Sequence, residues 1–175
     1  MYTVDERDEV VELNGLPLSL GGAPLPAVLA AGGRVLLAYL AERVDPDWDG
    51  SNPRSVTPDL HDEVVALLEF DSPRAHVFGS PNDETLSGYP LAKRGLGPYG
   101  TFEVRHSSWI RALERMNAVH PRHDPRRFDG LRHFIFTFHD STFECVARGV
   151  KFEVRGGSLA STVHELARRL VGAPG

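Results

Sequence analysis

The sequence predicts an α+β fold: a mainly antiparallel, barrel-like β-sheet core with one strand–helix–strand crossover and a C-terminal helix. Apolar and polar residues alternate through two turn signals in residues 132–155, which is the pattern of paired strands. Residues 109–120 and 161–170 instead carry apolar stripes at helical spacing. A chain of 175 residues with ordinary hydrophobic and charged fractions is expected to form one domain, residues 1–175.

Residues 132–155 are predicted to form a three-stranded meander. Turns are expected at 140–141 and 148–149, although Asp-Ser is a weak turn signal and the first turn can be longer. A two-residue first turn pairs Phe138 with Phe143. The other pairs in this register are Phe136 with Cys145, Phe134 with Ala147, Ala147 with Val150, Cys145 with Phe152 and Phe143 with Val154.

The two faces of this meander are expected to differ in environment. The paired apolar residues share one face, and a slip of one residue would turn the phenylalanines outward, so that face is the interior. The opposite face is expected to be solvated or to line a pocket. It carries His133, Thr137, His139, Thr142, Glu144, Lys151, Glu153 and Arg155.

The earlier part of the chain also favours strands. Asn-Gly at 14–15 predicts a hairpin, and Pro17 places its returning strand at a sheet edge. Residues 27–31 fit a strand or a short helix, and residues 34–43 fit a buried strand with a helix left open. Residues 63–70 are ambiguous, and we expect a strand there because a turn signal follows them.

The helix at 109–120 lies between predicted strands at 101–105 and 132–139. Such a helix usually packs back over the sheet, which makes its two flanking strands parallel with a right-handed crossover. His120 falls inside the apolar stripe of this helix, so it is expected to face the core.

Charge and composition argue against several classes of protein. The net charge is −5 and no basic cluster stands out, so nucleic acid is not an expected partner. The acidic start of the chain lacks an apolar run, so no membrane association is expected and the cytoplasm is the default location. The single cysteine, Cys145, excludes an internal disulfide and is expected to be a buried, unreactive thiol.

Residues 79–100 are expected to form a functional loop. They contain many Gly and Pro residues and show no apolar periodicity. Structureless loops longer than about 12–15 residues are uncommon in compact domains and often serve as binding loops or lids.

The first candidate site follows from the predicted crossover, which gathers the end of this loop and three histidines at one end of the sheet. Histidines near carboxylates can hold a divalent metal or act in acid–base chemistry. Pro121 separates His120 from His123, so they do not form a helical metal-binding pair. The alternative to a functional site is that His120 is a buried structural histidine and His123 is exposed. The candidates are His120, His123 and His133 as catalytic or metal-binding residues, with Asn82, Asp83, Glu84, Tyr99 and Arg148 as ligand-binding residues.

The second candidate site is the polar face of the meander, at its other end. His139 and Glu144 are expected to lie diagonally across the first hairpin, with Thr137 and Thr142 between them. A carboxylate beside an imidazole raises its basicity and fixes its tautomer, so this pair could act as a general base. The alternative is an ordinary solvated sheet face.

A third, weaker candidate is the acidic segment 45–50, which imitates the first half of a calcium loop. Val56 stands where a bidentate Glu is required and Pro53 occupies another ligand position, so we interpret it as a surface turn.

Two hypotheses for function remain. One is a small-molecule enzyme that uses histidine and carboxylate groups, with or without a divalent metal, in a pocket covered by the 79–100 loop. The other is a non-catalytic accessory, adaptor or inhibitor module that binds a protein partner through the edge strand near Pro17. A concave pocket at either histidine site, near the long loop, would favour the enzyme. A flat, fully solvated polar face with the loop packed down would favour the binding module. The sequence leaves the oligomeric state open.

Overall fold

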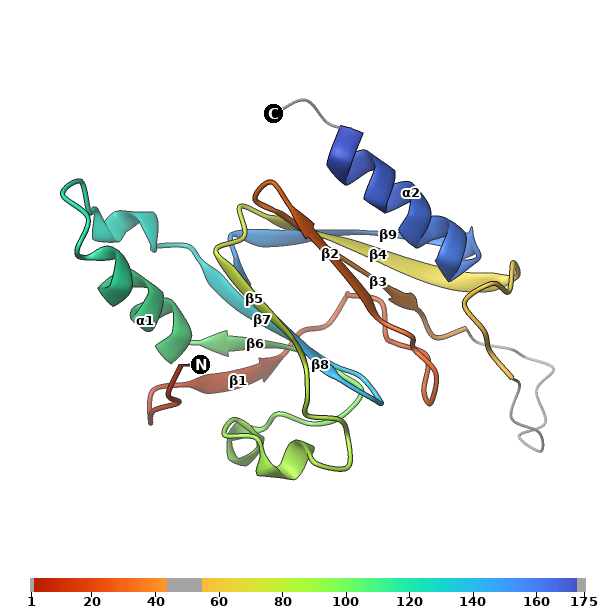
Figure 1. Cartoon of the computed structure of the whole chain (residues 1–175). Helices are drawn as coiled ribbons and strands as arrows, with labels where there is room; N and C mark the ends of the chain where they lie inside the picture. The colour runs from red at the N-terminus through yellow and green to blue at the C-terminus, as the bar shows by residue number, and fades with distance from the viewer. Residues whose placement is uncertain (1, 44–54, 173–175) are drawn as a thin grey trace.

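The computed structural model describes residues 2–43 and 55–172, which form two antiparallel sheets and two helices (Figure 1). The predicted α+β class is confirmed, but the sheets do not close into a barrel. The elements are β1 (Glu9–Glu12), β2 (Ala27–Ala31), β3 (Arg34–Leu40), β4 (Glu63–Asp71), β5 (Ala75–Gly79), β6 (Thr101–Arg105), α1 (Ser108–Asn117), β7 (Arg132–Thr137), β8 (Thr142–Ala147), β9 (Gly149–Gly157) and α2 (Leu159–Gly172).

The first sheet has the strand order β1-β6-β7-β8-β5, and the second has the order β2-β3-β4-β9. Two short connections join them, because the chain passes from β4 to β5 and from β8 to β9. Only Arg148 separates β8 from β9. The second predicted turn is therefore a crossing between sheets, and β9 pairs with β4 where the meander required it to pair with β8.

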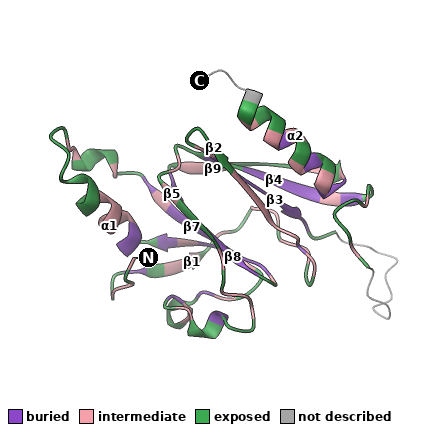
Figure 2. Cartoon of the chain, in the orientation of Figure 1, coloured by how far each residue is buried: buried purple, intermediate pink, exposed green. Residues whose placement is uncertain are grey.

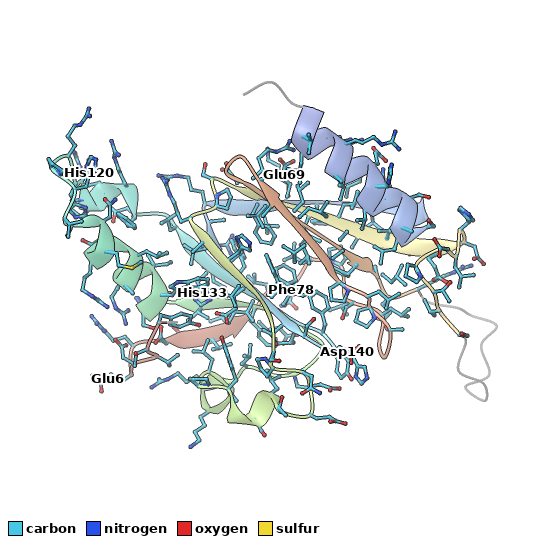
Figure 3. The ribbon with its side chains drawn as sticks, viewed as in Figure 1. Glu6, Glu69, Phe78, His120, His133 and Asp140 are labelled. Atoms are coloured by element: carbon cyan, nitrogen blue, oxygen red, sulfur yellow. The ribbon has the colours of Figure 1, made fainter. Side chains whose placement is uncertain are left out.

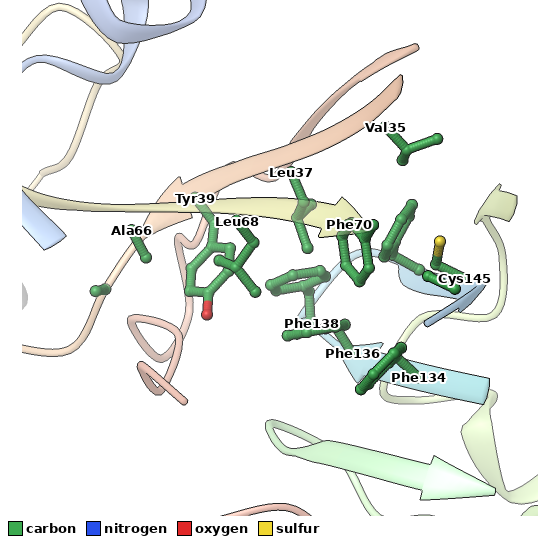
Figure 4. Close-up of a cluster of buried hydrophobic side chains, with 13 residues drawn as sticks. Val35, Leu37, Tyr39, Ala66, Leu68, Phe70, Phe134, Phe136, Phe138 and Cys145 are labelled. Carbon is green, nitrogen blue, oxygen red and sulfur yellow. The ribbon is translucent and has the colours of Figure 1, made fainter. Parts of the chain in front are cut away.

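The main core lies between the two sheets and is rich in aromatic residues (Figure 4). Phe134, Phe136 and Phe138 are buried, which confirms the predicted interior side of this segment. They pack on the second sheet through Phe70, whose ring is 6.0 Å from that of Phe136, and through Tyr39, whose ring is 5.2 Å from that of Phe138. The alternation of these residues along the strands therefore provides one continuous apolar layer.

The predicted register of the first hairpin is wrong by two residues. Phe136 pairs with Phe143 and Phe134 pairs with Cys145, because residues 138–141 form a longer turn closed by a 2.8 Å hydrogen bond from the Phe138 N–H to the Ser141 carbonyl. A shift of two residues keeps every side chain on its face, so the prediction of the core survived this error.

The ambiguous segments resolve as strands, and the C-terminal helix packs on the sheet that they form. Residues 27–31, 34–40 and 63–71 are β2, β3 and β4. Helix α2 packs on the outer face of the second sheet through Leu159 and Leu166 (Figure 2).

The predicted parallel crossover is wrong, because β6 and β7 are adjacent and antiparallel. Helix α1 does not cross the sheet. It lies beside the end where β6 stops and β7 starts, and it packs there through Trp109 on Leu131 and Val146. As a consequence, residues 80–100 lie at the opposite end of the sheet, near Thr137 and Thr142.

Candidate functional site

The loop 80–100 packs directly on the outer face of the first sheet. Leu86, Leu91 and Leu96 are buried there against Phe102 and Ile135. Thr137, predicted as a ligand-binding residue, fastens this loop: its hydroxyl donates to the Gly97 carbonyl at 2.8 Å and accepts from the Gly100 N–H at 3.0 Å. The polar face of the hairpin is therefore largely covered by protein.

Two of the predicted catalytic residues, His133 and Glu144, meet beneath this cover. The His133 Nε2 lies 2.8 Å from Glu144 Oε2, and its Nδ1 lies 2.9 Å from the Ser107 hydroxyl. Their residues are buried, with exposed fractions of 0% for His133 and 4% for Glu144. One ring nitrogen of His133 therefore faces a carboxylate and the other faces a hydroxyl, so both are hydrogen-bonded within the protein.

Glu144 has two further partners, both phenols. The Tyr2 hydroxyl donates to Oε2 at 2.7 Å, and the Tyr89 hydroxyl donates to Oε1. Burial alone would raise the pKa of Glu144, but hydrogen bonds from His133, Tyr89 and Tyr2, together with the charge of His133, hold this pKa below its ordinary value. Burial, followed by the nearby carboxylate, raises the pKa of both tyrosines, so they remain protonated donors.

The amino-terminal segment seals this cluster. The Tyr2 ring stacks on Trp109 at 5.1 Å and meets the His133 ring edge-on at 5.5 Å. Asp8 is buried, and its carboxylate accepts from the Ser108 N–H at 2.6 Å, at the start of α1. Ser107 is the N-cap of that helix and accepts from the Ile110 N–H.

Chemically, a hydroxyl, an imidazole and a carboxylate in line resemble a nucleophilic triad. Here all three groups are covered, so a substrate cannot reach the Ser107 oxygen in this conformation. The arrangement does join four parts of the chain: the amino-terminal segment, loop 80–100, the start of α1 and the first sheet. The sequence missed Ser107, Tyr2 and Tyr89, and only the N-cap position of Ser107 offered a signal.

The other predicted catalytic histidine, His139, pairs with Asp83 and is separate from Glu144. The Asp83 Oδ2 lies 2.9 Å from His139 Nδ1 and also accepts from the Tyr99 hydroxyl. The Asp83 N–H donates to the His139 carbonyl at 3.0 Å, which anchors the loop to the end of β7. Tyr99 adopts a φ of 56°, in the left-handed region that aromatic residues rarely occupy.

This second cluster faces solvent. The His139 side chain is 39% exposed, and its Nε2 lies 3.8 Å from the nearest carboxylate oxygen of Asp140. The hydrogen bond to Asp83 raises the pKa of His139, and hydrogen bonds from Tyr99 and His139 lower the pKa of Asp83. With Asp83 on Nδ1, the solvent-facing Nε2 beside Asp140 can exchange a proton or bind an anion.

The three histidines proposed for a metal site do not gather. Figure 3 shows His120 far from His133, and His120 is exposed because α1 ends at Asn117, which corrects its predicted core position. His123 lies 3.0 Å from the Asn117 side-chain oxygen, and both ring nitrogens of His133 are occupied. Among the described residues, no group of three His, Cys, Asp or Glu side chains is arranged to hold a metal ion.

The remaining predicted site residues are dispersed. Asn82 accepts from the Thr85 N–H at 3.2 Å and shapes the loop, whereas Glu84 is exposed. Arg148 is exposed at the start of β9, at the end of the sheet away from that loop. The calcium-like segment 45–50 falls outside the described residues.

A narrow hollow beside the second cluster is lined by Tyr99, Thr137 and Phe138, and the larger hollows on the described surface lie elsewhere. Three of them, of about 190, 330 and 340 Å³, are lined by none of His133, Glu144, Asp83 and His139. The smallest lies between α2 and β9.

Strand β9 forms an open edge of the second sheet (Figure 1). Phe152 is 49% exposed and Val154 is 47% exposed, although both are on the face that carries the core residues of β4. Lys151 and Glu153 project from the opposite face, and neither forms an ion pair or hydrogen bond within the described part of the chain. This edge combines apolar surface, free charges and a long extended backbone.

Comparison with known proteins identifies no relative: no family model, curated protein or solved structure matches this chain. In the described residues, neither helix has the length and apolar character needed to span a membrane.

Proposed function

We propose that this protein is a non-catalytic binding module that takes up an extended segment of a protein partner as an additional strand on β9. The observation that carries this proposal is the open edge itself. It is nine residues long and exposes Phe152 and Val154 on its apolar face. Addition of a strand supplies backbone hydrogen bonds for affinity and pockets for alternate side chains for specificity.

The register of the sheet identifies the backbone groups that a partner would meet. The Ala41 N–H donates to the Val64 carbonyl at 2.8 Å, so alternate residues of β4 starting at Val64 direct their backbone groups toward β3. The residues between them bond to β9, through positions such as Lys151 and Glu153. The backbone groups of Val150, Phe152 and Val154 therefore point away from the sheet.

The arrangement of the buried cluster around His133 and Glu144 also supports a binding role. Loop 80–100 is packed against the sheet through buried leucines, and His133 and Glu144 lie beneath it, each hydrogen-bonded within the protein. These are the properties of a structural support for the scaffold, and the exposed surface of the molecule then provides its interactions.

A labelled peptide with the sequence of residues 148–157 tests this proposal, because β9 is itself a strand of suitable length and alternation. We expect saturable binding, with amide shifts and slowed hydrogen exchange confined to Val150, Phe152 and Val154. Phe152→Asp should abolish binding, whereas Phe78→Asp on β5, an edge strand of the first sheet where this residue is 42% exposed, should preserve it. Absence of binding at millimolar peptide, or shifts that map away from β9, would refute the proposal.

A second candidate function is acid–base or anion-binding chemistry at His139, favoured by the Asp83 carboxylate on Nδ1 and the solvent-facing Nε2. Titration with inorganic phosphate tests the anion branch by NMR. We expect shifts of the His139 ring that disappear in His139→Gln. Equal shifts at the exposed His76 would show nonspecific binding and remove this candidate.

A further inference from the structure

We infer that the strand added to β9 is β9 of a second copy of this chain, in an antiparallel pair about a two-fold axis. This inference rests on the proposed function, since it names the partner for the same edge. A two-fold pair joins the two four-stranded sheets into one continuous sheet, with both α2 helices on the same side.

The sequence of β9 is complementary to itself in one register. Its outward backbone groups belong to Val150, Phe152 and Val154, so an added strand must pair these positions with one another. With Phe152 on the axis, Phe152 meets Phe152 of the partner copy, and Val150 meets Val154. This register forms about six backbone hydrogen bonds between the copies.

The charged face selects the same register. With Phe152 on the axis, Lys151 of each copy lies opposite Glu153 of the other, which gives two ion pairs. These positions fall between the hydrogen-bonded pairs, where opposing side chains are closest. Within one copy Lys151 lies opposite Glu69, but Glu69 is bound to Arg34 at 3.0 Å, so the ammonium group is free for an intermolecular partner.

Neighbouring registers are less favourable. With Glu153 on the axis, two glutamates meet and Lys151 faces Arg155, so every charged contact is repulsive. With Lys151 on the axis, two lysines meet. With Val154 on the axis, Glu153 would face Arg155, which already binds Glu165 of α2 at 2.9 Å. In that register Phe152 would also lose its aromatic partner.

The surrounding structure leaves the edge accessible. Helix α2 packs on Leu36, Ala38 and Leu40 of β3 and on Val65 and Leu67 of β4, and a hollow lies between this helix and the charged face of β9. About half of Phe152 and about half of Val154 are exposed, so the first sheet does not fully cover these two residues. Edge strands that avoid pairing commonly carry charged side chains, especially lysine. On β9 the charges are of opposite sign, and Lys151 and Glu153 attract a second strand in this register.

The test uses the two charge reversals Lys151→Glu and Glu153→Lys, separately and mixed, in sedimentation velocity over a concentration series. Wild type should show a reversible monomer–dimer equilibrium. Each variant alone places two like charges opposite each other and should weaken the dimer by about tenfold or more. An equimolar mixture of the two should restore the dimer, because both intermolecular pairs become attractive again. Thermal melts of the separate variants check that each is folded.

The outcomes distinguish this inference from the proposed function. A wild type that remains monomeric at millimolar concentration overturns the inference, and binding of the 148–157 peptide would then still support a different partner at this edge. A dimer that persists in Phe152→Asp, or single variants whose mixture does not regain the dimer, places the contact on another surface and also overturns it. Loss of both peptide binding and dimerisation removes the proposed function as well.

Discussion

Replacing Glu144 with alanine should destabilise the protein more than any other single carboxylate change described here. The side chain accepts hydrogen bonds from His133, Tyr2 and Tyr89, and the residue is 4% exposed. Removing one partner of a buried charged pair typically costs about 3–5 kcal/mol, because the other polar groups are left in a low-dielectric interior. Tyr2 lies near the chain terminus and can turn toward water, so we expect about 4 kcal/mol rather than the sum of three lost bonds.

For a protein of this size, that loss corresponds to a decrease in Tm of about 8–16 °C. Urea unfolding followed by tryptophan fluorescence measures it, since the Trp109 ring stacks on Tyr2 beside the pair. Glu165→Ala is the matched control. That carboxylate binds Arg155 and Arg169 at the surface with 40% of its side chain exposed, and its loss should cost less than about 1 kcal/mol.

The pH dependence gives an independent measure of the same pair. Because the folded-state pKa of Glu144 is lowered, its contribution to stability is complete above the ordinary pKa of about 4.3 and is lost as the pH falls toward the lowered value. Glu144→Gln cannot ionise, so its stability should fall less steeply below about pH 4.5. A loss under about 1 kcal/mol in Glu144→Ala at pH 7, or identical acid profiles, would refute the reasoning.

Three other predictions test the core and the exposed cluster. Burial raises the pKa of Cys145 to about 12, so its thiol should resist iodoacetamide in the native protein and react only after unfolding, and fast native labelling would contradict its burial. Asp83→Asn should lower the pKa of His139, measured by NMR, toward about 6.5. In the wild type this pKa is raised, so the pair stabilises the fold below about pH 6.5 and ceases to do so as the pH rises through the raised pKa. An unchanged His139 titration in the variant would exclude the contact. Phe136→Ala should cost about 3–5 kcal/mol in urea unfolding, and a loss as small as that of the 42% exposed Phe78→Ala would place Phe136 outside the core.

Alternation was sufficient to predict the core face but insufficient to predict strand pairing. Phe134, Phe136 and Phe138 are buried as expected, because a period of two is a property of the strand alone. The partner of a strand depends on turns and on distant segments. The turn over residues 138–141 shifted the first register, and the pairing of β9 with β4 required a strand about 85 residues earlier in the chain, which no local pattern indicates.

The site residues show the same division between local and distant information. The sequence identified His133, His139, Asp83 and Glu144 as candidates, but assigned the histidine–carboxylate partners incorrectly. The error follows from the crossover: antiparallel pairing of β6 and β7 exchanges the end of the sheet that receives loop 80–100. His139 consequently meets Asp83, and Glu144 is left for His133 on the neighbouring strand.

Polar residues on a sheet face indicate solvent only when no other segment covers that face. Leu86, Leu91 and Leu96 are dispersed in a Gly- and Pro-rich segment and show no helical or strand period, yet they supply the apolar cover of the first sheet. No apolar period in this segment indicated that the loop packs inward. Once it does so, Glu144 requires internal partners, and the histidine and tyrosines around it satisfy that requirement. The buried cluster is thus explained by packing, which is why the open edge at β9 carries the stronger argument for function.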